Sequence, residues 1–306
     1  MNEQETKSVL TIALMAAFAD GLKDERERAA VKRVADALGP EAGFDLPGLY
    51  RDVLLSKPDL AQVASAMQSQ ESRQLAYEMA VGVCDADGAQ GPAEAEFLAK
   101  LAGVLNLPAT ITGNLNASAD RVADAAFEPA APVTGTVLGK ANVSAAEMDQ
   151  MILNASITNA ALELLPESIA SMAIIPLQLR LVYRIGKVHG YEMDRTHARD
   201  FLATLGVGLT GQYLEQFGRR LLGGLLGGIG RQAVSSGLTF ATTYALGRVA
   251  QRYYAGGRTL DTATLKQTFA SLLEEARGLA PRYQGEIERK AGSIDTRSLA
   301  SLIKQV

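Results

Sequence analysis

The chain has 306 residues, enough for two domains, and 47% of them are hydrophobic, which is ample for a core in each. Its single cysteine, Cys84, excludes an intramolecular disulfide and a zinc site built from several thiolates. With two histidines and no recognisable arrangement of nucleophile and base, we expect the protein not to be an enzyme. Cys84 falls on the apolar face of an expected helix and is predicted to lie in the core.

The net charge of −4 conceals a difference between the two halves of the chain. Residues 1–132 contain 20 acidic and 11 basic side chains, whereas residues 133–306 contain 14 acidic and 19 basic ones. The acidic half would repel nucleic acid, and the other half has no dense basic run with interleaved aromatics, so we expect no nucleic-acid partner. The Arg-rich half suits an acidic partner or anionic lipid.

Apolar residues recur at spacings of three and four along the first part of the chain, and this pattern predicts helices. The expected helices there are 10–18, 26–38, 46–55, 60–67, 72–83 and 94–105. The pattern fails over 109–144, where 126–136 has the Ala, Pro and Gly content of a linker. We therefore predict an all-α protein with two helical domains, 1–108 and 145–306, joined by a flexible linker at 109–144.

A weak internal repeat lies within the first domain. The Ala-Asp-Gly sequence at 19–21 recurs at 86–88, and Glu27 aligns with Glu94. In each copy the glycine can adopt the left-handed conformation that ends a helix. The glutamate falls in the first turn of the next helix, where the helix dipole favours a negative charge.

On these residues the chain resembles, over 8–108, the TerB-like domain, a helical domain named for bacterial tellurite-resistance operons. The resemblance rests on both Ala-Asp-Gly turns, on the Glu that follows seven residues after each Asp, and on the apolar helix after it. It implies an all-helical fold and, for some members, divalent cations at clustered acidic residues. Carried over by position, the candidate metal ligands are Asp20, Glu27, Asp87 and Glu94.

The residues themselves leave the role of these four carboxylates open. Oxygen-only ligands suit Ca²⁺ or Mg²⁺ if the two turns meet in space. The segment 85–88 nevertheless lacks the remaining ligand positions of an EF-hand. The alternative is that each Asp caps a turn and each Glu satisfies a helix N-terminus.

The second half opens with a capping-box pattern, Ser144 with Glu147, which predicts a helix to about residue 164. Residues 201–247 then carry only four charged side chains and include a Gly-rich run at 221–230. The longest uncharged runs are 14 and 16 residues, whereas a membrane span needs roughly 20 apolar residues. We expect a buried hairpin in a soluble domain, or a hairpin that lies on or dips into a membrane.

Two other polar motifs only partly match known sites. The segment 134–141 approaches a phosphate-binding loop but has Thr where Gly is needed and Ala where Ser or Thr must hold Mg²⁺. Nucleotide hydrolysis is therefore not expected. His189 and His197 flank Asp194, but the helix-start signals there predict loop and helix-start residues instead of metal ligands.

A block of sequence near the end of the Gly-rich region carries a second resemblance. Thr-Tyr-Ala-Leu-Gly-Arg at 243–248, with Tyr253, Tyr254 and Gly257, resembles the YcjF-type domain of unknown function, and the likeness covers 145–280. That bacterial domain is often attached to, or encoded beside, GTPases, and some members are membrane proteins. The resemblance therefore implies a GTPase partner and a membrane nearby.

Together these features predict a non-enzymatic, stress-related adaptor that responds to a divalent cation and docks a GTPase or a similar assembly. The polar, acidic start of the chain is unlike a secretory signal, so a cytoplasmic location at the periphery of the inner membrane is expected. The alternative is an integral or re-entrant membrane protein with a cytoplasmic acidic domain. A metal-dependent hydrolase is the third and least favoured possibility.

Overall fold

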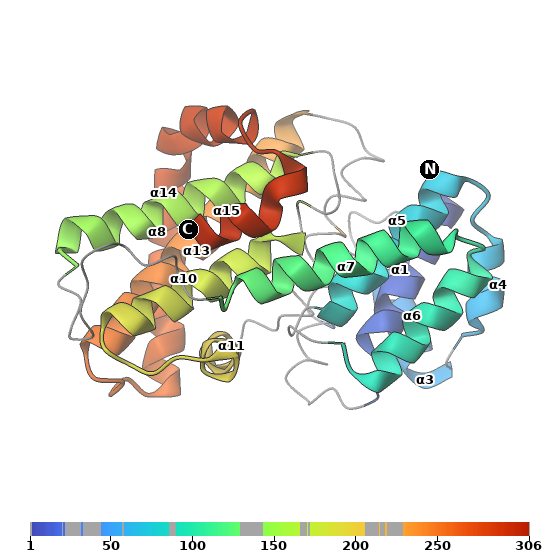
Figure 1. Cartoon of the computed structure of the whole chain (residues 1–306), viewed down its shortest axis with the longest axis horizontal. Helices are drawn as coiled ribbons and strands as arrows, with labels where there is room; N and C mark the ends of the chain where they lie inside the picture. Colours follow the sequence, from blue (N-terminus) through green and yellow to red (C-terminus); the bar gives the residue numbers. More distant parts are fainter. Residues whose placement is uncertain are drawn as a thin grey trace. The chain divides into compact units, whose positions relative to one another are not determined.

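The computed structural model describes residues 2–19, 21, 32, 44–56, 58–85, 90–128, 143–165, 170, 172–205, 214, 218 and 229–305. Every regular element within these ranges is a helix (Figure 1), so the predicted all-α fold is confirmed there. The helix predicted at 26–38, the linker residues 129–142 and the Gly-rich run 221–228 lie outside the described ranges. The chain forms two units: Met1–Arg121 with Val207–Gly228, and Val122–Gly206 with Ile229–Val306.

The first unit is organised around its N-terminal helix. Its helices are α1 (Glu3–Ala17), α3 (Leu46–Ser56), α4 (Leu60–Ser65), α5 (Gln70–Cys84), α6 (Pro92–Val104) and most of α7 (Ala109–Ala125). Helix α1 contacts α3, α4, α5 and α6 (Figure 1). Nearly every side chain from Val9 to Ala17 is buried, because a helix that is apolar on all sides must be surrounded. Cys84, at the end of α5, is fully buried, as predicted.

Helices α3 to α6 confirm the sequence prediction to within two residues at each end, but two other boundaries were wrong. Helix α1 begins at Glu3 instead of residue 10, because Asn2 and Glu5 form a reciprocal capping box. The linker prediction fails over 109–125, which form α7. That helix buries small side chains such as Ala119 and Ala125, so the large apolar residues that normally mark a helix are few.

The second unit is built around α13. Its elements are α8 (Ala145–Glu163), α10 (Ile174–Val188), α11 (Arg195–Thr204), α13 (Ile229–Ala255), α14 (Thr262–Ala291), the 3-10 turn η2 (Thr296–Ser298) and α15 (Leu299–Gln305). Helix α13 contacts α8, α10 and α14, while the short α15 packs against α10 (Figure 1). The predicted helix start at Ser144 is confirmed, since the Ser144 hydroxyl accepts a hydrogen bond from the backbone N–H of Glu147.

Three helices of this unit meet at the 243–248 block. A Cβ added to Gly247 would lie 2.9 Å from Ile152 of α8 and 3.0 Å from Leu181 of α10, so the backbones approach closely there. One turn earlier, the buried Thr243 hydroxyl accepts hydrogen bonds from Asn159 at 3.0 Å and Gln178 at 3.1 Å. The 243–248 block is therefore a packing and hydrogen-bonding centre of the core.

Helices α13 and α14 are the two longest in the described ranges. Helix α14 continues to Ala291 although Pro281 inside it removes one backbone hydrogen bond. Buried Ala276 and Ile287 hold the segments on either side of Pro281 against the core. No helix in the described part of the chain is both long enough and apolar enough to cross a bilayer.

Candidate functional site

Of the four predicted metal ligands, only Glu94 belongs to the described residues, whereas Asp20, Glu27 and Asp87 lie outside them. Glu94 is buried in the first turn of α6, and its Oε2 accepts a hydrogen bond from the backbone N–H of Gly91 at 2.7 Å. This is the helix-start role that the sequence offered as the alternative to a metal ligand. Within the described ranges, no group of three or more His, Cys, Asp or Glu side chains could hold a metal ion.

The two histidines occupy the positions predicted for them. Asp194 is the N-cap of α11, and its Oδ1 accepts a hydrogen bond from the backbone N–H of His197 at 2.8 Å. That bond, together with the contact between Oδ1 and the His197 ring, lowers the pKa of Asp194. His189 ends α10, with its ring Nδ1 2.8 Å from the Ile185 carbonyl oxygen. His189 and His197 thus both lie at helix ends.

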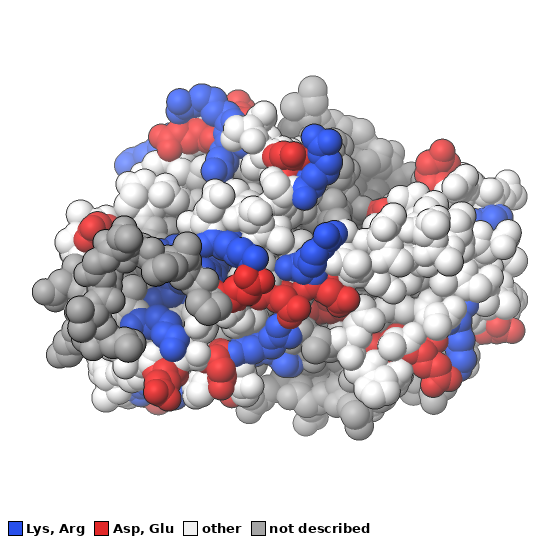
Figure 2. Space-filling model, in the orientation of Figure 1, with Lys and Arg blue, Asp and Glu red and all other residues white. Residues whose placement is uncertain are grey.

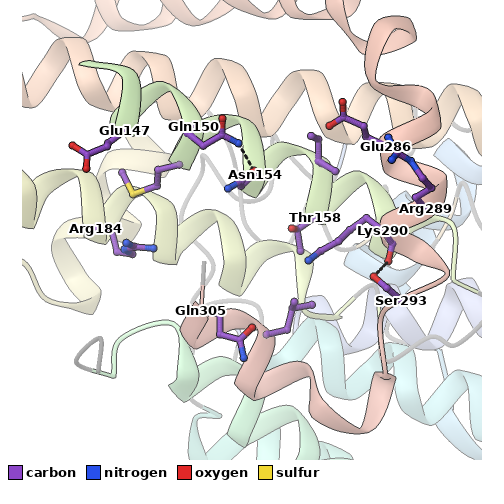
Figure 3. Close-up of a pocket in the computed structure, with 13 residues that line it drawn as sticks. Glu147, Gln150, Asn154, Thr158, Arg184, Glu286, Arg289, Lys290, Ser293 and Gln305 are labelled. Carbon is purple, nitrogen blue, oxygen red and sulfur yellow. Dashed lines mark hydrogen bonds between the residues drawn. The ribbon is translucent and has the colours of Figure 1, made fainter. Parts of the chain in front are cut away.

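A cleft of about 950 Å³ lies in the second unit and is a candidate site (Figure 3). Its walls come from α8, α10, α14 with the turn after it, and α15. The lining residues are Glu147, Gln150, Met151, Asn154, Ile157, Thr158, Arg184, Glu286, Arg289, Lys290, Ser293, Leu302 and Gln305. The α8 residues recur at intervals of three and four, so they share one side of the helix over about 16 Å. The cleft therefore extends along about three turns of α8.

Arg184 is the most unusual side chain of the cleft. It projects from α10 into the space beneath α8 (Figure 3) and is largely buried. No hydrogen bond or ion pair joins it to another residue of the described ranges. Burial lowers the pKa of its guanidinium, because a charge removed from water without a partner is costly. Arg289 and Lys290 are the other cationic residues of the lining, and Lys290 extends towards Thr158.

Of the two acidic residues of the lining, Glu147 is hydrogen-bonded to Ser144 and Glu286 points out of the cleft. Glu147 Oε2 accepts hydrogen bonds from both the backbone N–H and the hydroxyl of Ser144, each at 2.8 Å. These bonds, the backbone one first, lower the pKa of Glu147. The carboxylate of Glu286 points away from the interior of the cleft (Figure 3). Neither carboxylate is paired with Arg184 in the described structure.

Arg180 lies one turn before Arg184 on α10. Its buried guanidinium is hydrogen-bonded to backbone carbonyls of neighbouring segments. Its Nη1 donates to the backbone carbonyls of Ala126, at 3.4 Å, and Glu128, and its Nη2 donates to the carbonyl of Lys304 at 3.3 Å. An ion pair of 2.6 Å between Lys304 and Glu128 lies beside these bonds. Arg180 thus ties α10 to α15 and to the segment that follows α7.

Other basic side chains of the second unit are already paired. On the face shown in Figure 2, basic and acidic side chains of this unit lie next to one another. Arg195 forms an ion pair with Asp124 at 2.6 Å, and Arg248 forms one with Asp149. The surplus of Arg in this half is thus partly neutralised within the fold, and Arg184 differs from these residues in having no such carboxylate in the described ranges.

Sequence reasoning did not identify this cleft. Of its lining residues only Glu147 had been singled out, and that was for its capping role. One sequence signal was available: Arg180 and Arg184 stand one turn apart in α10, a helix rich in apolar residues. A charged residue on an apolar helix face requires either a partner or a function, and only the structure separates the partnered Arg180 from Arg184.

Comparisons with known proteins give one match, which covers the first unit. Residues 1–119 match the model of a family described as a protein of unknown function, DUF533. No curated protein and no solved structure matches the chain. Residues beyond 119, the cleft included, lie outside the family match.

Proposed function

We propose that this chain is a non-enzymatic, stress-related adaptor that docks a protein partner in the cleft of its second unit. The cleft carries the proposal, because it combines a cationic anchor with amide, hydroxyl and apolar side chains along about 16 Å of α8. These are groups that recognise a surface by charge, hydrogen bonds and apolar contact. The first unit then serves as the attached TerB-like module.

The TerB-like part of this proposal is supported by the family match. DUF533 is grouped with the TerB-like families, and the match covers the region over which the repeated Ala-Asp-Gly turns were found. For the second unit, a GTPase is the partner class that the YcjF-type resemblance implies. The basic surplus of this half suits an acidic partner and a position at the periphery of the inner membrane, on its cytoplasmic side.

Site-specific photo-crosslinking in a lysate of the native host tests the docking proposal. A photoreactive amino acid replaces Asn154, an exposed residue of the cleft, and in a control chain it replaces Gln267, an exposed residue of α14 outside the cleft. We expect a discrete crosslinked protein from position 154 only, whose yield changes between GDP and a non-hydrolysable GTP analogue. The same products from both positions, or none from position 154, would contradict docking in the cleft.

The proposal also includes a divalent-ion response of the first unit, through Asp20, Glu27, Asp87 and Glu94. Ca²⁺ and Mg²⁺ are the cations that such oxygen ligands suit. Titration of the ¹⁵N-labelled full chain with each ion is expected to shift the amides at these four positions saturably. Amides that do not shift at millimolar ion would remove the ion response and leave Glu94 solely as the cap of α6.

A further inference from the structure

We infer that the cleft of the second unit accepts an acidic, partly apolar segment of the partner protein, with one carboxylate of that segment bound by Arg184. This inference rests on the proposed docking function and names the chemistry of the partner. It concerns the side chains of α8, α10, α14 and α15 that line the cleft (Figure 3).

The charge of the ligand follows from Arg184. A guanidinium presents a planar fork of N–H donors that matches a carboxylate, and such bonds are about twice as strong as those between neutral groups. Arg184 is largely removed from water and has no carboxylate partner in the described ranges, whereas Arg180 one turn away donates to three backbone carbonyls. An arriving carboxylate would offset the cost of burying the Arg184 charge. Lys290 lies in the same cleft and strengthens its preference for an anion.

The length and the composition of the cleft favour a peptide segment over a small anion. The α8 wall extends over about 16 Å, which is the length of about five residues of extended chain. Met151, Ile157 and Leu302 provide apolar surface along it, and Gln150, Asn154 and Gln305 provide amide groups at intervals. A free phosphate or a small carboxylic acid would use Arg184 but would leave most of this wall uncovered.

Two matched peptides test the inference directly. The ¹⁵N-labelled full chain is titrated with acetyl-Leu-Glu-Leu-Glu-Leu-amide and with the same peptide carrying Gln in place of Glu. We expect saturable shifts of the Asn154, Thr158 and Ser293 amides with the Glu peptide, and binding at least about tenfold weaker with the Gln peptide. Equal affinity for the two peptides, or no saturable shift with the Glu peptide, would overturn the inference.

Variants of the chain separate the role of Arg184 from general charge effects. Arg184→Gln is expected to weaken binding of the Glu peptide at least about tenfold, with Arg184→Lys in between because an ammonium cannot form the two-pronged contact. Arg282→Gln, which removes an exposed charge of α14 outside the cleft, is the matched control and is expected to bind like the unaltered chain. A loss of equal size in Arg282→Gln and Arg184→Gln would overturn the inference.

Further measurements identify the chemical source of the anion. They also separate a failure of anchoring by Arg184 from a failure of docking itself. Inorganic phosphate or citrate binding as tightly as the Glu peptide, or Arg184-dependent binding to phosphatidylglycerol vesicles, would contradict a protein ligand. Crosslinking from position 154 is expected to fall at least about tenfold in Arg184→Gln. Crosslinking that persists undiminished would leave docking intact and overturn the anchoring role of Arg184, whereas its absence from the unaltered chain would contradict docking itself.

Discussion

Glu5 joins two segments of the first unit through a single buried carboxylate. Its Oε1 accepts hydrogen bonds from the backbone N–H groups of Ser69 and Gln68, both at 3.2 Å, and from the Ser72 hydroxyl at 3.1 Å. Its Oε2 accepts one from the backbone N–H of Asn2. The bond from Ser69, followed by that from Asn2, makes the largest contribution to lowering the pKa of Glu5 to about 2. One side chain thus caps α1 and also holds the start of α5.

The low pKa of Glu5 predicts a specific acid sensitivity of the first unit. Because the pKa is lower in the folded than in the unfolded state, this contribution is fully present above about pH 4.5 and is lost as the pH falls towards 2. Glu5→Gln is expected to destabilise the chain at pH 7 and to flatten the decline in stability between pH 5 and 2. Urea unfolding at several pH values measures this, with the exposed Glu3→Gln as control. Parallel pH curves for Glu5→Gln and the unaltered chain would refute the assignment.

Gly247 and Gly285 predict opposite effects of the same substitution. A Cβ at position 247 would overlap Ile152 and Leu181, so Gly247→Ala is expected to cost about 1–3 kcal/mol. Gly285 is in α14 with open space around it, so Gly285→Ala is expected to stabilise the chain by about 0.5–1 kcal/mol. Chemical denaturation of both variants measures the difference. Equal effects would show that helix propensity, and not the close contact of α13, governs position 247.

At the scale of elements, the attachment of α15 depends on Arg180. Leu299 and Ile303 of α15 are buried, and Arg180 donates to the Lys304 carbonyl near the end of this helix. Because α15 has only seven residues, its stability must come from such contacts and not from its own hydrogen bonds. Since Leu302 and Gln305 line the cleft, the position of α15 also shapes the candidate site.

Arg180→Met is expected to loosen α15 without unfolding the rest of the second unit. The amide of Ile303 is predicted to exchange with deuterium at least about tenfold faster, because the local opening of α15 loses one of its anchors. Glu128→Gln removes the half-exposed ion pair to Lys304, which is worth at most about 1 kcal/mol, so its effect is expected to be smaller. Unchanged exchange at Ile303 in Arg180→Met would show that apolar contacts alone hold α15.

Capping boxes and apolar periodicity predicted some helix boundaries correctly and others wrongly. The capping box at Ser144 and Glu147 precedes a run that was recognised as helical, and α8 begins there. Asn2 and Glu5 form the same pattern, but polar residues follow them, so the start of α1 was missed although Thr6 and Ser8 are buried. In α7 the buried residues are mostly alanines, whose burial depends on neighbours and leaves little periodic signal. Local sequence thus predicted helices where large apolar residues mark one face.

At the scale of the whole molecule, the all-α class of the described residues agrees with the sequence pattern, but the candidate site does not follow from it. The cleft draws on segments near residues 150, 184, 290 and 303, which only the packing of the helices brings together. Whether Arg184 has a charged partner depends on the residues of neighbouring helices, so the spacing of residues in the sequence does not reveal it. Conversely, the carboxylates of the repeated turns were visible in the sequence, and the one in the described ranges, Glu94, caps α6.

Scanning calorimetry of the full chain, unaltered and as Arg184→Met, tests the central claim that Arg184 is retained for a ligand at the expense of stability. Without peptide, Arg184→Met is expected to melt at a higher temperature, because it removes a partly buried charge that has no partner in the described ranges. With the Glu peptide, only the unaltered chain is expected to gain stability. A lower melting temperature for Arg184→Met, together with no gain by the unaltered chain on adding the peptide, would contradict the account.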